Sequence, residues 1–270
     1  MANPYLPQEI LDYVIDLLHD EPEILKRCCL ISNSWVPRTR KYLFADIKFS
    51  SASDLESWKK TFPDITNSPA FHARTLFVGC PQFVVAADAE EGGWIQTFSG
   101  VKSLDVDTGD QYLRAAAVSL APFCKFPPTL KSLYVGAIIL PYPGLFDLIL
   151  SFPLLEDLGL AGYDEPGLDG SGLHGPQTIV PSTSPVFTGT LEFRRLEGAG
   201  DIARQLLDLP NGLHFRKLTL AWDDRAEELQ WMMELVAKCS HTLQSLDVTY
   251  VFRRMSIHTR SVPIIYSISS

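Results

Sequence analysis

The chain has 270 residues, a formal net charge of −9 and 46% hydrophobic residues, enough apolar material for a sizeable core in one or two domains. The negative charge argues against nonspecific nucleic-acid binding, which needs cations that displace counterions from phosphate. Five irregularly spaced cysteines indicate reduced thiols and no charged-then-apolar leader opens the chain, so we expect an intracellular protein of the cytoplasm, the nucleus or both, without a membrane partner.

A helix is predicted over 6–18, in the stretch LPQEILDYVIDLL. At about 100° per residue its apolar side chains cover an arc of roughly 160°, wider than the ~100° stripe of a helix that packs on one core. Two further short helices are predicted, one from about Pro22 and one from about Ser34 to Leu43. Three such helices form only a marginal core unless another body covers them. The excess of apolar surface therefore predicts a protein partner.

The order and spacing of LPQEILDYVIDLL, ILKRCCLISNSW and VPRTRKYLF resemble the F-box family along its whole motif. The resemblance implies that residues 1–44 form a helical module that docks on the Skp adaptor of an SCF-type (cullin–RING) ubiquitin ligase. It further implies the following adaptor-facing or adaptor-supporting residues: Leu6, Pro7, Ile10, Ile15, Leu18, Leu25 and Trp35. The sequence does not separate residues that touch the adaptor from residues that pack inside. An ordinary three-helix start to a larger fold is the alternative.

A short alternating pattern then repeats along the chain: an apolar residue, two variable ones, then apolar, any, apolar. Its central residues are Ile47, Leu76, Leu104, Leu133, Leu158, Leu191, Leu218 and Leu246. Successive spacings are 29, 28, 29, 25, 33, 27 and 28 residues, close to the ~20–29-residue period of leucine-rich repeats, which pair a strand with a helix. We therefore predict an α/β fold in which residues 45–270 form a leucine-rich-repeat-like solenoid, with parallel strands on the concave face and helices outside.

Helical patterns lie between several of these strands. Ser53 and Glu56 have the spacing of a capping box at the start of one helix. Further helical segments are predicted over 112–120, 143–152 and 202–207, and a long last one over 229–239. The asparagine ladder of the best-known repeat consensus is missing. The repeats therefore resemble the irregular leucine-rich class found behind many F-boxes.

Two places depart from the period. Residues 161–188 are dense in Gly, Pro and Ser and predict a long loop, which either contacts a ligand or serves as flexible filler. The tail after residue 250 has no helical period, so the last repeat either ends in an irregular cap over 262–268 or is truncated.

Catalytic and metal-binding motifs have little support. Gly170, Gly172 and Gly175 form a literal G-x-G-x-x-G, but Pro176 follows where a dinucleotide site needs a helix. Cys28 and Cys29 are adjacent, which is not a zinc spacing, and read as buried helix thiols. The six histidines are scattered and no nucleophile elbow or phosphate loop is present in the sequence. We expect a noncatalytic protein without a cofactor or a metal.

The remaining candidate is a binding surface on the strands. Residues that alternate with the apolar pair of each strand point to the opposite face of the sheet. The candidate substrate-binding residues on that face are Asp105, Asp107, Tyr134, Asp157, Glu192, Arg194, Thr219 and Asp247. Tyr134 is the expected aromatic anchor, and the net acidic row favours a basic partner. A generic solvated sheet face is the alternative.

These observations predict a substrate-recognition adaptor: residues 1–44 bind the Skp adaptor and, through it, the ligase, while the repeats recruit an unknown protein substrate. A leucine-rich-repeat interaction scaffold that takes no part in ubiquitination is the other hypothesis. Co-purification with the Skp adaptor distinguishes the two.

Overall fold

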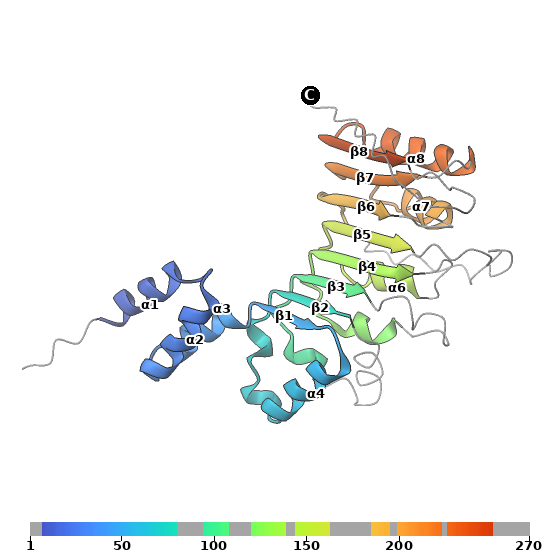
Figure 1. Cartoon of the computed structure of the whole chain (residues 1–270). Helices are drawn as coiled ribbons and strands as arrows, with labels where there is room; N and C mark the ends of the chain where they lie inside the picture. The colour runs from blue at the N-terminus through green and yellow to red at the C-terminus, as the bar shows by residue number, and fades with distance from the viewer. Residues whose placement is uncertain are drawn as a thin grey trace, which may run out of the picture.

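The computed structural model describes residues 7–79, 94–107, 120–138, 144–162, 185–194, 199–222 and 226–250. These residues form an α/β fold in which eight parallel strands make one sheet and three helices extend from its β1 end (Figure 1). No helix within the described ranges is long and apolar enough to cross a bilayer.

The three N-terminal helices are α1 (Gln8–Leu17), α2 (Pro22–Ile31) and α3 (Val36–Leu43). Proline begins α2, where its missing N–H would have no intrahelical partner in any case. The helices share a small core of their own around three buried side chains, Ile15, Leu25 and Cys28. Partly buried hydrophobic side chains pack against this core: Leu18, Trp35, Tyr42 and Leu43.

A polar cluster joins α1 to α3. The Asp16 carboxylate accepts hydrogen bonds from both Nε and Nη2 of Arg38, and Oη of Tyr42 donates to Asp16 Oδ1 at 2.7 Å. These donors, Arg38 first, lower the pKa of Asp16 from 3.8 to about 2. The cluster fixes which face of α1 turns inward.

The sheet runs in chain order, each strand pairing in parallel with the next. Its strands are β1 (Asp46–Phe49), β2 (Thr75–Val78), β3 (Ser103–Asp107), β4 (Ser132–Ile138), β5 (Asp157–Gly162), β6 (Thr190–Arg194), β7 (Lys217–Trp222) and β8 (Ser245–Tyr250). The eight central residues of the sequence pattern form one continuous register, from Ile47 opposite Leu76 through to Leu218 opposite Leu246. The predicted strands and their parallel pairing are confirmed.

Helical segments connect the strands and cover one face of the sheet. They are α4 (Ala52–Thr61), α6 (Leu145–Leu150), α7 (Ala199–Leu207) and α8 (Ala226–Cys239), with the 3-10 helices η1 (Ile65–Asn67), η2 (Pro69–His72), η3 (Ile95–Thr97) and η4 (Ala121–Lys125). Figure 1 shows α6, α7 and α8 along the same side of the sheet. One continuous core combines the apolar strand residues with buried helix residues such as Leu55 and Leu235. The opposite side of the sheet, here called the open face, carries the alternate strand residues.

The start of α4 differs from the sequence prediction. The capping box consists of Ser51 and Asp54, not Ser53 and Glu56: Oγ of Ser51 accepts from the Asp54 N–H, and Asp54 Oδ2 accepts from the Ser51 N–H at 3.0 Å. Asp54 Oδ2 also accepts from the Ser50 N–H at 2.9 Å. The Asp54 carboxylate thus accepts hydrogen bonds from two backbone N–H groups. If the helix began two residues later, these two donors would lose that acceptor.

Other predicted segments are described in part. The strand β5 extends to Gly162, two residues into the predicted Gly/Pro/Ser-rich loop, and Phe187 near the end of that loop is fully buried in the core. The helix over 143–152 is confirmed as α6, which begins after Gly144 at φ 80°. The segments 112–119 and 163–184 and the tail 251–270, for which the sequence also made predictions, lie outside the described residues.

Candidate functional site

The outward side of α1 is an exposed apolar stripe, made of Ile10, Tyr13, Val14 and Leu17 with 48%, 62%, 40% and 64% of their surfaces exposed. Their spacing of three, four and seven residues places them on one face of the helix, within an arc of about 100°. The neighbouring face carries Ile15, which is 1% exposed in the N-terminal core. The broad apolar arc of this helix is therefore two stripes, one packed and one bare.

The residues assigned by resemblance to the adaptor divide into three groups. Ile10 and Pro7 are exposed. Ile15 and Leu25 are buried inside the N-terminal core, while Leu18 and Trp35 are half-buried against it. Leu6 lies outside the described residues.

Exposed apolar side chains that the sequence assignment omitted also lie on α2. Leu30 and Ile31, at its C-terminal end, are 88% and 66% exposed. Together with Tyr13, Val14 and Leu17 they are the residues that sequence reasoning missed. The apolar pattern of α1 indicated Val14 and Leu17, which fall inside its predicted apolar arc, whereas Tyr13 lies about 40° outside that arc.

On the open face, the strand register aligns one side chain from each strand in a single cross-strand row. The row reads Lys48, Phe77, Asp105, Tyr134, Gly159, Glu192, Thr219 and Asp247. Five of the eight predicted substrate-binding residues therefore belong to one row. Asp107 and Arg194 lie two residues further along their strands, and Asp157 two residues before Gly159.

The Tyr134 side chain leans over the neighbouring strand β5 instead of pointing straight away from the sheet. A Cβ at Gly159 would come within 2.5 Å of Cδ2 of the Tyr134 ring, and a Cβ at Gly136 within 3.1 Å of its Cε1. The ring therefore fills the space that side chains at these two glycines would need. Burial, and then the charges of Asp107, Asp105 and Glu192, raise the pKa of Tyr134, while Arg194 lowers it.

Asp105 stands between Phe77 and Tyr134 in the row. Its Oδ1 is buried and has no hydrogen-bond partner among the described residues. Burial, reinforced by the charge of Asp107 and opposed by that of Lys48, raises the pKa of Asp105 from 3.8 to about 6.

Most other charges of the open face are matched within the protein. Arg194 forms an ion pair with Glu192, and Nζ of Lys217 lies 3.1 Å from Oδ2 of Asp247. Asp157 Oδ1 accepts a hydrogen bond of 2.6 Å from the Thr190 N–H. Among the predicted residues of the row, Asp105 differs from the others because one of its carboxylate oxygens is buried without a hydrogen-bond donor among the described residues.

Three members of the row lay outside the sequence prediction: Gly159, and Lys48 and Phe77 because the prediction began at the third strand. Phe77 on β2 faces Lys48 on β1, whose Nζ lies 4.5 Å from the ring centroid in a cation–π contact. The alternation in these two strands is the signal that could have found them.

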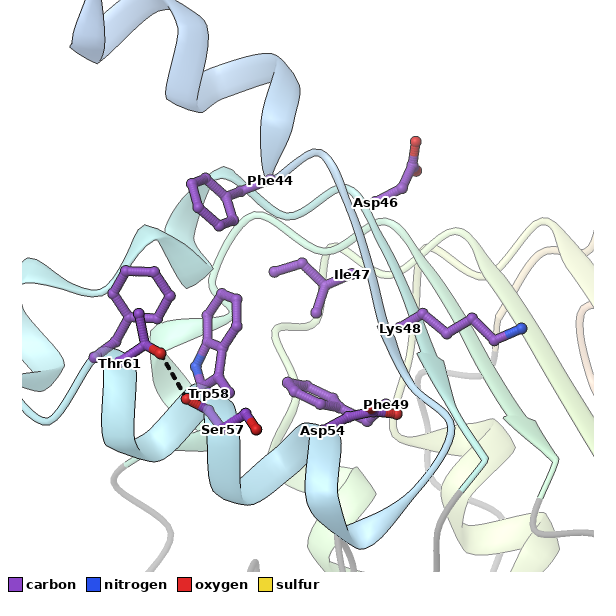
Figure 2. A pocket seen from close by; sticks show the side chains of 10 residues that line it. Phe44, Asp46, Ile47, Lys48, Phe49, Asp54, Ser57, Trp58 and Thr61 are labelled. Carbon is purple, nitrogen blue, oxygen red and sulfur yellow. Dashed lines mark hydrogen bonds between the residues drawn. The ribbon is translucent and has the colours of Figure 1, made fainter. Parts of the chain in front are cut away.

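A hollow of about 360 Å³ lies between α4 and β1 (Figure 2). Ile47 and Phe49 point toward Trp58, while Lys48 points to the other side of β1. Phe44, Trp58 and Phe62 form edge-on and tilted ring contacts, with centroids 4.7 to 5.9 Å apart. None of the sequence-predicted site residues lies in this hollow.

Within the described ranges, no group of three or more His, Cys, Asp and Glu side chains could hold a metal ion. Comparisons of the chain with family models, with curated proteins and with solved structures find no match. The geometry of the two exposed surfaces therefore carries the functional argument.

Proposed function

We propose that the protein is a noncatalytic substrate adaptor of an SCF-type ubiquitin ligase. In this proposal α1 to α3 form an F-box that binds the Skp adaptor, and the sheet with its helices forms irregular leucine-rich repeats. The open face recruits a protein substrate to the ligase. The sequence resemblance over residues 1–44 supplies the identity of the partner.

The single observation that carries the proposal is the bare apolar stripe of α1. Four large side chains at helical spacing are 40% to 64% exposed on a helix whose other apolar side is already packed. Contiguous apolar surface of this kind marks an interaction site, because exposing it to water is unfavourable. If α1 served only as an N-terminal cap of the fold, its inward-facing residues would have to be apolar and its outward-facing residues would not.

Binding of the purified full chain to the purified Skp adaptor, measured by biolayer interferometry, tests the proposal. Burying a leucine side chain contributes about 1.5–3 kcal/mol, so Leu17→Ala is expected to weaken binding about tenfold to a hundredfold. Leu17 is 64% exposed, so the variant should fold as the wild type does.

Leu154→Ala is the matched control. Leu154 is 53% exposed and lies between α6 and β5, so its loss should leave the affinity unchanged. If the wild-type chain does not bind, or if both variants bind equally well, the N-terminal helices do not dock on this adaptor. The protein would then be an interaction scaffold.

A further inference from the structure

The open face contains an acidic position flanked by two aromatic ones. Phe77, Asp105 and Tyr134 are opposite one another on β2, β3 and β4. Adjacent strands lie about 4.8 Å apart, so the two ring-bearing backbone positions are about 10 Å apart with the short aspartate between them. The Tyr134 ring lies over Gly159 on β5, on the side away from Asp105. The Phe77 ring faces Lys48 on β1.

The cations of the open face have contacts of their own within the protein. Arg194 pairs with Glu192, Lys217 pairs with Asp247, and Lys48 lies over the Phe77 ring. The buried Oδ1 of Asp105, in contrast, has no hydrogen-bond donor among the described residues. A buried acceptor without a donor is unfavourable, so the protein itself leaves the charge of the Asp105 carboxylate poorly compensated, and a cation that docks against the exposed part of the side chain compensates it.

The chemistry of this position favours a guanidinium group. Arginine is planar and always charged, it offers several N–H donors to a carboxylate, and its flat faces stack on aromatic rings. Lysine has the charge but not the plane, and a neutral amide or urea has no charge. Asp107, two residues along β3, adds a second carboxylate and so favours a cation further.

We propose that the open face is a docking surface for a protein segment that presents an arginine side chain. The Asp105 carboxylate accepts hydrogen bonds from its guanidinium group, and Phe77 and Tyr134 provide the flanking rings. The inference rests on the proposed function and deepens it, because it names the chemistry of the segment that the adaptor recruits.

The test uses the purified full chain and pools of fluorescein-labelled heptapeptides, with binding measured by fluorescence anisotropy. The central residue of each pool is fixed as arginine, lysine, citrulline or glutamine, and the other positions are randomised among uncharged residues. The arginine pool should bind at least about tenfold more tightly than the citrulline pool, because charge-assisted hydrogen bonds are the stronger ones. It should also bind more tightly than the lysine pool.

Two variants test the assigned residues. Asp105→Asn should reduce binding of the arginine pool to the citrulline level, and Tyr134→Leu should weaken it about threefold or more through loss of stacking. Asp147→Asn is the control: Asp147 is an exposed carboxylate on α6, so the same change of net charge there should leave binding unchanged. If Asp105→Asn does not fold by circular dichroism, Tyr134→Leu decides.

Several results would overturn the inference: no binding of any pool, equal binding of the arginine and citrulline pools, lysine binding as tight as arginine, or equal weakening by Asp105→Asn and Asp147→Asn. No adaptor is present, so Leu17→Ala should bind the arginine pool as the wild type does. A chain that binds the arginine pool but not the Skp adaptor contradicts the proposed function alone. The converse contradicts this inference alone.

Discussion

The raised pKa of Asp105 makes the stability of the fold depend on pH in a definite direction. An acid whose pKa is higher in the folded state, about 6 against 3.8, stabilises the fold below about pH 3.8 and loses this contribution as the pH rises through about 6. Near pH 7.5 the charged carboxylate therefore destabilises the protein. Asp105→Asn is expected to raise the free energy of unfolding by about 2 kcal/mol there, less than the full shift implies because the side chain is partly exposed.

Urea unfolding, followed by circular dichroism at about pH 7.5 and about pH 4, measures this difference. The gain should shrink toward zero at the lower pH, where the wild-type carboxyl is largely protonated. Asp147→Asn on α6 should change stability little at either pH. A gain from Asp105→Asn that is the same at both pH values would show that the charge of Asp105 is not its source.

We predict that the position of the Tyr134 ring requires Gly159 on the neighbouring strand, because a larger residue there would leave no room for the ring. A methyl group at Gly159 would come within 2.5 Å of the ring, so Gly159→Ala should displace it and destabilise the protein by about 1–3 kcal/mol. In the Tyr134→Leu background the same substitution should have a smaller effect. A double-mutant cycle by urea unfolding measures the coupling, and purely additive effects would contradict the packing described here.

Among the elements, α1 offers the sharpest test of the division into two stripes. Ile15 is 1% exposed and Leu17 is 64% exposed. Ile15→Ala should therefore destabilise the N-terminal helices by about 2–4 kcal/mol, whereas Leu17→Ala should change their stability by less than about 0.5 kcal/mol. Amide hydrogen exchange over residues 8–43 of the full chain measures both effects. Equal losses of protection would mean that Leu17 packs inside.

The sequence could predict the strands because a sheet buried on one side leaves a period-two pattern, and here it recurs near every 28 residues. It could not divide the apolar arc of α1, since inward and outward residues such as Ile15 and Leu17 are both apolar. The predicted capping box was wrong for a related reason. Ser51–Asp54 and Ser53–Glu56 have the same spacing of serine and carboxylate, and only the fold shows which carboxylate reaches the Ser50 and Ser51 N–H groups.

The open-face row required the register as well as the alternation. The alternation identifies which residues of β3 and β4 face away from the core, and it led to Asp105 and Tyr134. The position of Tyr134 over Gly159, and the place of Lys48 and Phe77 in the same row, follow from pairing between strands far apart in the chain. No local pattern contains that information.

At the scale of the whole molecule, the two exposed surfaces lie on different parts of the fold. The apolar stripe is on α1, and the acidic and aromatic row crosses the sheet from β1 to β8 (Figure 1). Such a separation suits a protein that holds one partner by its N-terminal helices and another by its sheet. The two binding events should then be independent, as the separate variants are designed to show.

Isothermal titration calorimetry of the full chain with the purified Skp adaptor, repeated at several temperatures, tests the central claim most directly. Burial of apolar surface gives a negative heat-capacity change on binding. We expect one adaptor per chain, a negative heat-capacity change, and a smaller one for Leu17→Ala. No heat of binding at any temperature, or a heat-capacity change near zero that Leu17→Ala leaves unaltered, would contradict the claim that the bare stripe of α1 is the docking surface.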